Sequence, residues 1–286
     1  MGEISRVGVI GAGLMGSGIA EVAARAGMDV RVTEVNQPAL DAGRKKIEGS
    51  MARAVSRGKL SEEDQAAALS RLSYTTDLTD FADRDLIIEA IAENEQLKLE
   101  VFGALDKIGC GPNTIFASNT SSIPIMKLGM ATTRPEQVVG IHFFNPVPVL
   151  KLVELIPSLL TSDETIQTAR SFASNVMGKI VIRSQDRAGF VVNALLIPYI
   201  LSAIRMLESG FASVEDIDNG MVYGCSHPMG PLRLADLIGL DTTKAVADSM
   251  YEEFKEPLYT APPLLLRMVD AGLLGKKSGR GFYEYN

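Results

Sequence analysis

The chain has 286 residues, of which 46% are hydrophobic and 22% are charged, a composition typical of a globular protein with roughly two domains. Its formal net charge of −7 opposes binding to a phosphate backbone, so we expect no nucleic-acid partner. Cys110 and Cys225 are far apart and outside any CxxC spacing. This argues against a disulfide framework and a zinc site, and it favours a reducing, cytoplasmic location.

The first part of the chain, from Arg6 to about Ile182, alternates short β-branched runs with helix-sized segments. Continuous apolar runs of this length are typical of a parallel sheet whose two faces are covered by helices. We therefore predict an α/β domain over residues 1–186 with a Rossmann-type, doubly wound, mostly parallel sheet. The predicted strands are 6–10, 29–33, 85–91, 114–117, 138–144, 151–156 and 179–183.

Three glycines follow the first predicted strand with the spacing GxGxxG: Gly11, Gly13 and Gly16. Glycine allows the tight turn, the close approach of a pyrophosphate to the backbone, and the packing of the next helix against the sheet. We expect these glycines, together with Leu14 and Met15 between the second and third glycine, to contact a dinucleotide cofactor.

Glu34 ends the next predicted strand, at the spacing expected for a ligand of the ribose diol. A carboxylate accepts hydrogen bonds from a 2′-hydroxyl and repels a 2′-phosphate. No arginine follows in the next three residues. We therefore predict NAD, rather than NADP, as the cofactor.

His142 and Glu154 lie in two consecutive apolar runs. Because a nicotinamide exchanges only a hydride, an alcohol dehydrogenase also needs a group that takes the hydroxyl proton. Imidazole exchanges protons near neutral pH, and an unpaired carboxylate in an apolar strand would be costly. We predict that Glu154 pairs with His142 and orients it as a general base. The residues alone leave open a hydrogen-bonded core histidine and a solvent-facing glutamate.

The stretch 188–204 carries no charge and reaches the lower limit of transmembrane length. It contains Gly189, Asn193 and Pro198 in the middle of the chain, so we predict a buried helix and no membrane association. From residue 187 onward the apolar spacing is helical. We predict a second, all-helical domain over residues 187–286, which would serve in substrate binding and dimerisation.

Several motifs in this chain resemble, in the same order, those of the L-3-hydroxyacyl-CoA dehydrogenase family. The resemblance covers nearly the whole chain, and the ordered set is more specific than any single motif. The motifs are SNTSS at 118–122, HFFNPVP at 142–148, KLVE at 151–154, GFVVN at 189–193, HPMGP at 227–231 and GKKSGRGFY at 275–283.

The resemblance implies that His142 and Glu154 form the catalytic pair. It also implies that Ser121 and Asn193 contact the reacting oxygen or its surroundings, since a hydroxyl and an amide can orient a 3-oxo group and stabilise charge on it. Taken alone, Ser121 fits a turn or helix-cap residue and Asn193 a polar group at a helix start.

Two basic residues, Arg53 and Arg57, lie four positions apart in a predicted helix and would share one face. Alone, they also fit a solvated basic face. The resemblance implies that these arginines and Ser50 contact coenzyme A, and that Glu93, Lys98 and Asn119 lie at the cofactor.

The activity implied by the resemblance is the NAD-dependent interconversion of (S)-3-hydroxyacyl-CoA and 3-oxoacyl-CoA. A four-carbon acyl group (3-hydroxybutyryl-CoA and acetoacetyl-CoA), a homodimer, and a role in fatty acid and butanoate metabolism are expected with it. A same-fold dehydrogenase acting on a sugar acid or another hydroxy acid without CoA, and a non-catalytic NAD-binding protein, stay open as alternatives.

The broader 3-hydroxyacid dehydrogenases rely on a lysine in the second part of the chain. No lysine occurs here between Lys179 and Lys244, which argues against that group. Two positions depart from the family pattern: Ala194 stands where many relatives have arginine, and Glu34 stands where aspartate is common. The first puts local substrate or interdomain contacts in doubt, and the second is chemically conservative.

Overall fold

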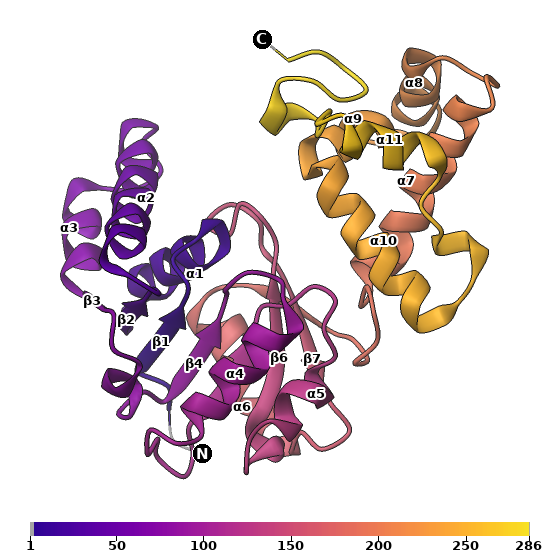
Figure 1. Cartoon of the computed structure of the whole chain (residues 1–286). Helices are drawn as coiled ribbons and strands as arrows, with labels where there is room; N and C mark the ends of the chain where they lie inside the picture. The colour runs from indigo at the N-terminus through magenta and orange to yellow at the C-terminus, as the bar shows by residue number, and fades with distance from the viewer. Residues whose placement is uncertain (1–2, 286) are drawn as a thin grey trace. The chain divides into compact units, whose positions relative to one another are not determined.

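A computed structural model describes residues 3–285 of the chain. The chain divides into two compact units (Figure 1), which we call unit 1, up to Asp186, and unit 2, from Arg187 onward. Among the described residues, no helix combines the length and the apolar character that crossing a bilayer requires.

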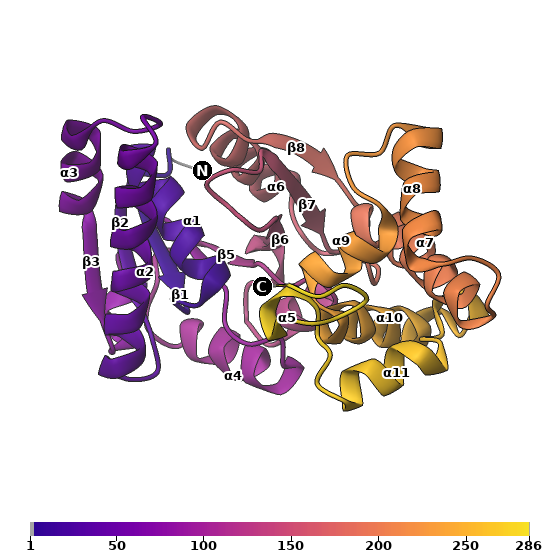
Figure 2. The same ribbon diagram turned by 90° about the horizontal axis from the view of Figure 1, so that it is seen from above.

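Unit 1 is built on an eight-stranded sheet with the strand order β3-β2-β1-β4-β5-β6-β7-β8. Figure 2 shows β3 and β2 at one side of unit 1 and β7 and β8 at the other. Neighbouring strands run parallel except for β6 and β7, which are antiparallel. The predicted fold class, a mostly parallel Rossmann-type sheet followed by helices, is confirmed. The strands are β1 (Arg6–Ile10), β2 (Asp29–Thr33), β3 (Leu72–Thr75), β4 (Leu86–Glu89), β5 (Ile115–Ser118), β6 (Val138–Phe143), β7 (Leu152–Pro157) and β8 (Ile180–Arg183).

Helices cover both faces of this sheet: α1 (Leu14–Arg25), α2 (Gln37–Ser56), α3 (Glu62–Ser70), α4 (Glu95–Leu105), α5 (Ile125–Met130) and α6 (Asp163–Ser171). Buried side chains of α1, α2, α3 and α6 share one apolar core with alternate strand residues such as Val9 and Val139. On the opposite face, Phe102 of α4 packs edge-on against Phe116 of β5, with ring centroids 6.4 Å apart. Short helical segments complete unit 1: the 3₁₀ helices η1 (Leu78–Phe81) and η2 (Pro135–Gln137) and the π-helix η3 (Phe172–Val176).

The apolar pattern did not predict β3. This four-residue strand forms the edge of the sheet beside β2, and all its side chains are only half-buried. An edge strand with one partner does not need the continuous apolar run that marks a central parallel strand. Its sequence, LSYT, therefore gave no signal.

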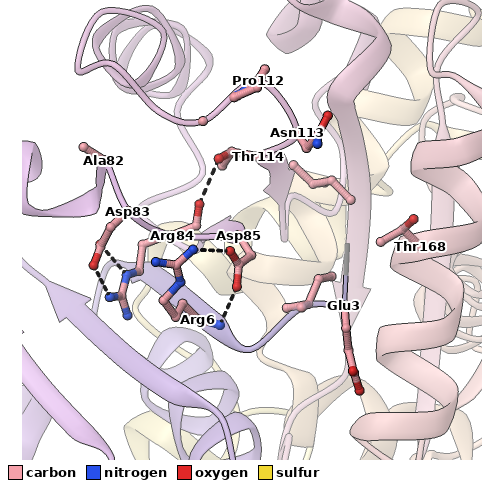
Figure 3. Close-up of a pocket in the computed structure, with 13 residues that line it drawn as sticks. Glu3, Arg6, Ala82, Asp83, Arg84, Asp85, Pro112, Asn113, Thr114 and Thr168 are labelled. Atoms are coloured by element: carbon pink, nitrogen blue, oxygen red, sulfur yellow. Dashed lines mark hydrogen bonds and ion pairs between the residues drawn. The ribbon is translucent and has the colours of Figure 1, made fainter. Parts of the chain in front are cut away.

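A cluster of charged side chains lies at the amino ends of β1 and β4 (Figure 3). Asp85 accepts hydrogen bonds from the backbone N–H groups of Ser5 at 3.0 Å and Arg6 at 2.8 Å, and from the Arg6 guanidinium at 2.8 Å. Burial alone would raise the pKa of Asp85, but these hydrogen bonds outweigh burial and lower the pKa to about 2. The buried guanidinium of Arg84 pairs with Asp83 at 2.7 Å. These contacts hold the strand starts together around a pocket of about 240 Å³.

Unit 2 is a group of helices around its own apolar core, in which Leu201, Ile204 and Leu232 are fully buried. We predicted a buried helix over 188–204, but α7 buries only one face, and its Leu195 is 74% exposed. A unit of this size does not supply enough partners to surround a helix. The elements are α7 (Val192–Glu208), α8 (Val214–Cys225), α9 (Pro231–Ile238), α10 (Leu240–Phe254), η4 (Pro257–Tyr259), α11 (Pro263–Asp270) and η5 (Lys276–Ser278).

Candidate active site

The GxGxxG segment forms the turn between β1 and α1 and the first turn of α1. Gly11 has a φ of +93°, and a Cβ at this position would lie 2.6 Å from the carbonyl oxygen of Ala90. A Cβ on Gly16 would collide with the carbonyl of Gly11. A Cβ on Gly13 would meet no atom within 4 Å. Gly13 therefore lies on the open side of the turn, next to the exposed Leu14, where a ligand can approach the backbone closely.

Glu34 follows β2, and its carboxylate lies against this glycine turn. Oε1 accepts a hydrogen bond from the backbone N–H of Ala12 at 2.7 Å, and Oε2 accepts one from Val35 at 3.1 Å. A carboxylate at this end of the second strand is the acceptor that a ribose diol requires. Met15 packs partly buried against the apolar core, so its side chain supports the turn. The residues present fit a dinucleotide.

A buried polar network lies at the carboxyl ends of β4 and β5. Glu89 and Lys98 are fully buried, and Lys98 Nζ donates to Glu89 Oε1 at 2.6 Å. Glu89 also accepts hydrogen bonds from the Ile91 N–H at 2.7 Å and from Ser118 Oγ at 2.6 Å, and Ser118 Oγ accepts one from the Thr120 N–H at 3.1 Å. Glu89 was not predicted from the sequence, where it is a single carboxylate inside an apolar run.

Glu93 organises the turn that carries Ser121. Its Oε1 accepts hydrogen bonds from Thr120 Oγ1 at 2.6 Å, from Ser121 N–H at 2.9 Å and from Ser122 N–H at 3.1 Å. Its Oε2 lies 3.3 Å from Lys98 Nζ. Desolvation would raise the pKa of Glu93, but the charge of Lys98 and these hydrogen bonds outweigh it, so the pKa is lowered. Glu93 is therefore ionised at neutral pH and fixes the backbone around Ser121.

His142 and Glu154 face each other across the antiparallel β6–β7 pair. They are partners in the register, and His142 Nδ1 lies 2.8 Å from Glu154 Oε2. Glu154 is fully buried, and the His142 side chain is 9% exposed. The ring centroids of His142 and Phe144 lie 4.7 Å apart. Asn119 Oδ1 accepts a hydrogen bond from the backbone N–H of Phe143 at 2.8 Å. Asn119 thus ties the end of β5 to the residue beside His142.

A second part of the site is a pocket of about 410 Å³ between α1, α2 and the segment that follows β6, which we call the α1–α2 pocket. Ser50 and Arg53 line it, together with Lys45 and Lys46, which were not predicted from the sequence. Arg57 is the exposed residue directly after α2 and lies outside this lining. Of the two arginines predicted to share one face, Arg53 therefore lines the pocket and Arg57 does not.

Asn193 lies in the first turn of α7, in unit 2, and is half-buried. The other side chains that we predicted as catalytic belong to unit 1. Within unit 1, the structure brings His142 into contact with Glu154, and Ser121 into contact with Glu93. The role of Asn193 stays a prediction, as do the catalytic roles of the other three residues.

Two family models match this chain: "3-hydroxyacyl-CoA dehydrogenase, NAD binding domain" over residues 6–187 and "3-hydroxyacyl-CoA dehydrogenase, C-terminal domain" over residues 189–285. A curated 3-hydroxybutyryl-CoA dehydrogenase of Mycobacterium tuberculosis is 61% identical over 282 residues, which cover 99% of each chain.

Solved structures agree with these matches. FadB2 of M. tuberculosis has a TM-score of 0.99 at 60% identity, with 100% of both chains covered. The (S)-3-hydroxybutyryl-CoA dehydrogenase of Ralstonia eutropha has a TM-score of 0.94 at 46% identity, with 99% of this chain and 100% of that chain covered. The resemblance and the NAD cofactor predicted from the motifs are confirmed. The chain belongs to the 3-hydroxyacyl-CoA dehydrogenase family of NAD-dependent oxidoreductases.

Proposed function

We propose that this chain interconverts (S)-3-hydroxyacyl-CoA and 3-oxoacyl-CoA, with 3-hydroxybutyryl-CoA and acetoacetyl-CoA as its substrates. The activities named for relatives that are 61% and 46% identical support the four-carbon acyl group. The observation that carries the proposal is the 2.8 Å contact between His142 Nδ1 and Glu154 Oε2. This contact lies at the carboxyl end of β6, and dinucleotides bind at that end of such sheets.

The proposed mechanism gives each of four side chains one task. When bound, NAD would supply the nicotinamide ring as the acceptor of the hydride that leaves C3 of the substrate. His142 Nε2 takes the proton of the 3-hydroxyl group during oxidation and returns it during reduction. Glu154 accepts a hydrogen bond from Nδ1–H, which selects the tautomer with a basic Nε2 and stabilises the imidazolium. Ser121 and Asn193 donate hydrogen bonds to the oxygen on C3 and stabilise charge on it.

We assign the proposed cofactor contacts as follows. Gly11, Gly13 and Gly16 allow the pyrophosphate to approach, and Glu34 binds the adenosine ribose. The ammonium of Lys98 is fully buried and bonds Glu89 and Glu93. We therefore assign Lys98 to holding Glu93 in place, and Glu93 and Asn119 to the nicotinamide half.

Glu34 should make the enzyme prefer NADH over NADPH. We expect the kcat/KM of the wild-type protein to be at least about 100-fold higher with NADH, because the carboxylate binds the 2′-hydroxyl and repels a 2′-phosphate. Glu34→Ala should lower kcat/KM for NADH by about tenfold and so narrow this preference. Glu34→Asp, which keeps the charge, is the control. Equal use of both cofactors by the wild-type protein would contradict the assignment.

The reaction is tested by following NADH oxidation with a series of oxo substrates. We expect turnover with acetoacetyl-CoA, and slower turnover as the acyl chain lengthens. Free 3-oxo acids and oxidised sugar acids should react poorly. Faster turnover of a substrate without CoA would instead favour a same-fold hydroxy-acid dehydrogenase. NADH binding without turnover of any 3-oxoacyl-CoA would favour a non-catalytic NAD-binding protein.

We also infer a homodimer formed through unit 2. Large apolar side chains of this unit are exposed, among them Leu195 on α7, Phe211 and Tyr223. Exposed apolar surface of this kind is typical of subunit interfaces. Light scattering should give twice the mass of the chain, and Phe211→Asp should shift the equilibrium toward the monomer. A monomeric wild-type protein at micromolar concentration would contradict the inference.

A further inference from the structure

Glu21 is a buried carboxylate with one unpartnered oxygen. It lies on α1 and is 1% exposed. Oε1 lies 3.2 Å from the guanidinium of Arg25, whereas Oε2 is buried without a hydrogen-bond partner among the described residues. Glu21 also lines the α1–α2 pocket. Buried carboxylate oxygens in folded proteins normally accept hydrogen bonds. An unpartnered one at a pocket wall points to a ligand that brings a donor.

The α1–α2 pocket has walls of two kinds. Lys45, Lys46 and Arg53 on α2 provide positive charge, whereas Leu14, Gly18 and the segment 145–148 provide a neutral wall. The neutral wall is closely packed, because a Cβ on Gly18 would lie 2.9 Å from the Cβ of Val147. The pocket also reaches Asn145, three residues after His142. It therefore fits a ligand with an anionic end and a long neutral arm that carries N–H donors.

We propose that Glu21 Oε2 accepts a hydrogen bond from an amide N–H of the pantetheine arm of the acyl-CoA substrate. Coenzyme A has the required chemistry, because its phosphates are anionic and its pantetheine arm is neutral and carries two amide groups. In this arrangement Lys45 and Lys46 bind the phosphates, and Glu21 selects thioesters that carry the arm over free 3-oxo acids. This inference rests on the proposed function and adds a specificity-determining residue to it.

The test distinguishes binding of the pantetheine arm from binding of the phosphates. It compares the KM for acetoacetyl-CoA with the KM for acetoacetyl-pantetheine, which lacks the phosphates. Glu21→Ala should raise KM about tenfold or more for both substrates, because it removes an acceptor with charge. Glu21→Gln, which still offers an amide oxygen, should restore much of the affinity. Lys46→Ala should raise KM for acetoacetyl-CoA and leave that for acetoacetyl-pantetheine unchanged. The KM for NADH should not change in any variant.

Glu21→Asp provides a second variant if the alanine protein does not fold. It keeps the charge and withdraws the carboxylate from the pocket by about one bond length, so KM should again rise for both substrates. An unchanged KM for acetoacetyl-pantetheine in Glu21→Asp or Glu21→Ala would overturn the inference, and so would an equal rise in the KM for NADH. In either case the proposed function would stand if the wild-type protein turns over acetoacetyl-CoA. Absence of that turnover would overturn both.

Discussion

Replacement of His142 by alanine is expected to lower kcat by about 10²- to 10⁴-fold, the usual contribution of a positioned general base. This corresponds to about 3–5 kcal/mol of activation free energy. The loss should appear in kcat and not in the affinity for NADH, because the variant keeps the glycine turn and the Glu34 carboxylate that are proposed to bind the cofactor. The measurement is steady-state NADH oxidation with saturating acetoacetyl-CoA, together with a fluorescence titration of NADH binding.

The control for this variant is His227→Ala, which removes the second histidine of the chain. The His227 imidazole lies 3.2 Å from the hydroxyl of Tyr199, in unit 2, and has no role in the mechanism. Its loss should change kcat by less than about threefold, as expected of a residue that only packs. If the protein lacking His142 turned over at a rate close to wild type, proton transfer by this imidazole would be ruled out.

Removal of Glu89 is expected to have the largest effect on stability. In Glu89→Leu, the fully buried ammonium of Lys98 loses its 2.6 Å partner and keeps only Glu93 at 3.3 Å. Breaking a buried ion pair at one partner costs about 3–5 kcal/mol. The free energy of unfolding of unit 1, measured by urea denaturation, should fall by about this amount. The turn that carries Ser121 also loses an anchor, because Ser118 Oγ donates to Glu89.

Two further variants test this explanation. The double variant Glu89→Leu/Lys98→Met removes both charges and should recover most of the stability, because two apolar side chains can replace a buried pair. It should not recover kcat, because Glu93 loses Lys98 in this variant. Asp85→Asn changes a carboxylate at the opposite end of β4 and should affect stability without changing kcat. If the double variant were no more stable than Glu89→Leu, the unpaired charge of Lys98 would not be the cause of the lost stability.

The parts of the fold that follow from local patterns could be predicted from the sequence. Seven strands of the sheet were expected from their apolar runs, and the glycine turn from its spacing. The strand β3 could not be predicted, because an edge strand is stabilised by its neighbour and not by an apolar run of its own. The exposed face of α7 could not be predicted either. An uncharged helical segment does not reveal how many of its faces are covered by other helices.

In the candidate site, too, contacts that follow from local patterns could be predicted, and contacts that depend on tertiary packing could not. His142 and Glu154 interrupt two consecutive apolar runs, so their contact could be expected from the cost of burying an unpaired carboxylate. Glu89 interrupts a third run, but its partner Lys98 lies in a helix whose charged sequence looks solvent-exposed. The pairing of these two residues depends on how α4 packs on the sheet, which the sequence pattern does not reveal. The inward position of Glu21 likewise depends on tertiary packing.

The reversal of direction between β6 and β7 has a consequence for how the protein folds. The remaining residues of these two strands are apolar, so hydrophobic contacts alone would tolerate several alignments of the two strands. A slip by one residue would turn Glu154 to the other face of the sheet and leave its carboxylate buried without the imidazole. His142, which is proposed to move the substrate proton, and Glu154, which is proposed to orient it, therefore also disfavour misaligned pairings of the two strands. Selection for activity at these positions is at the same time selection for one native strand alignment.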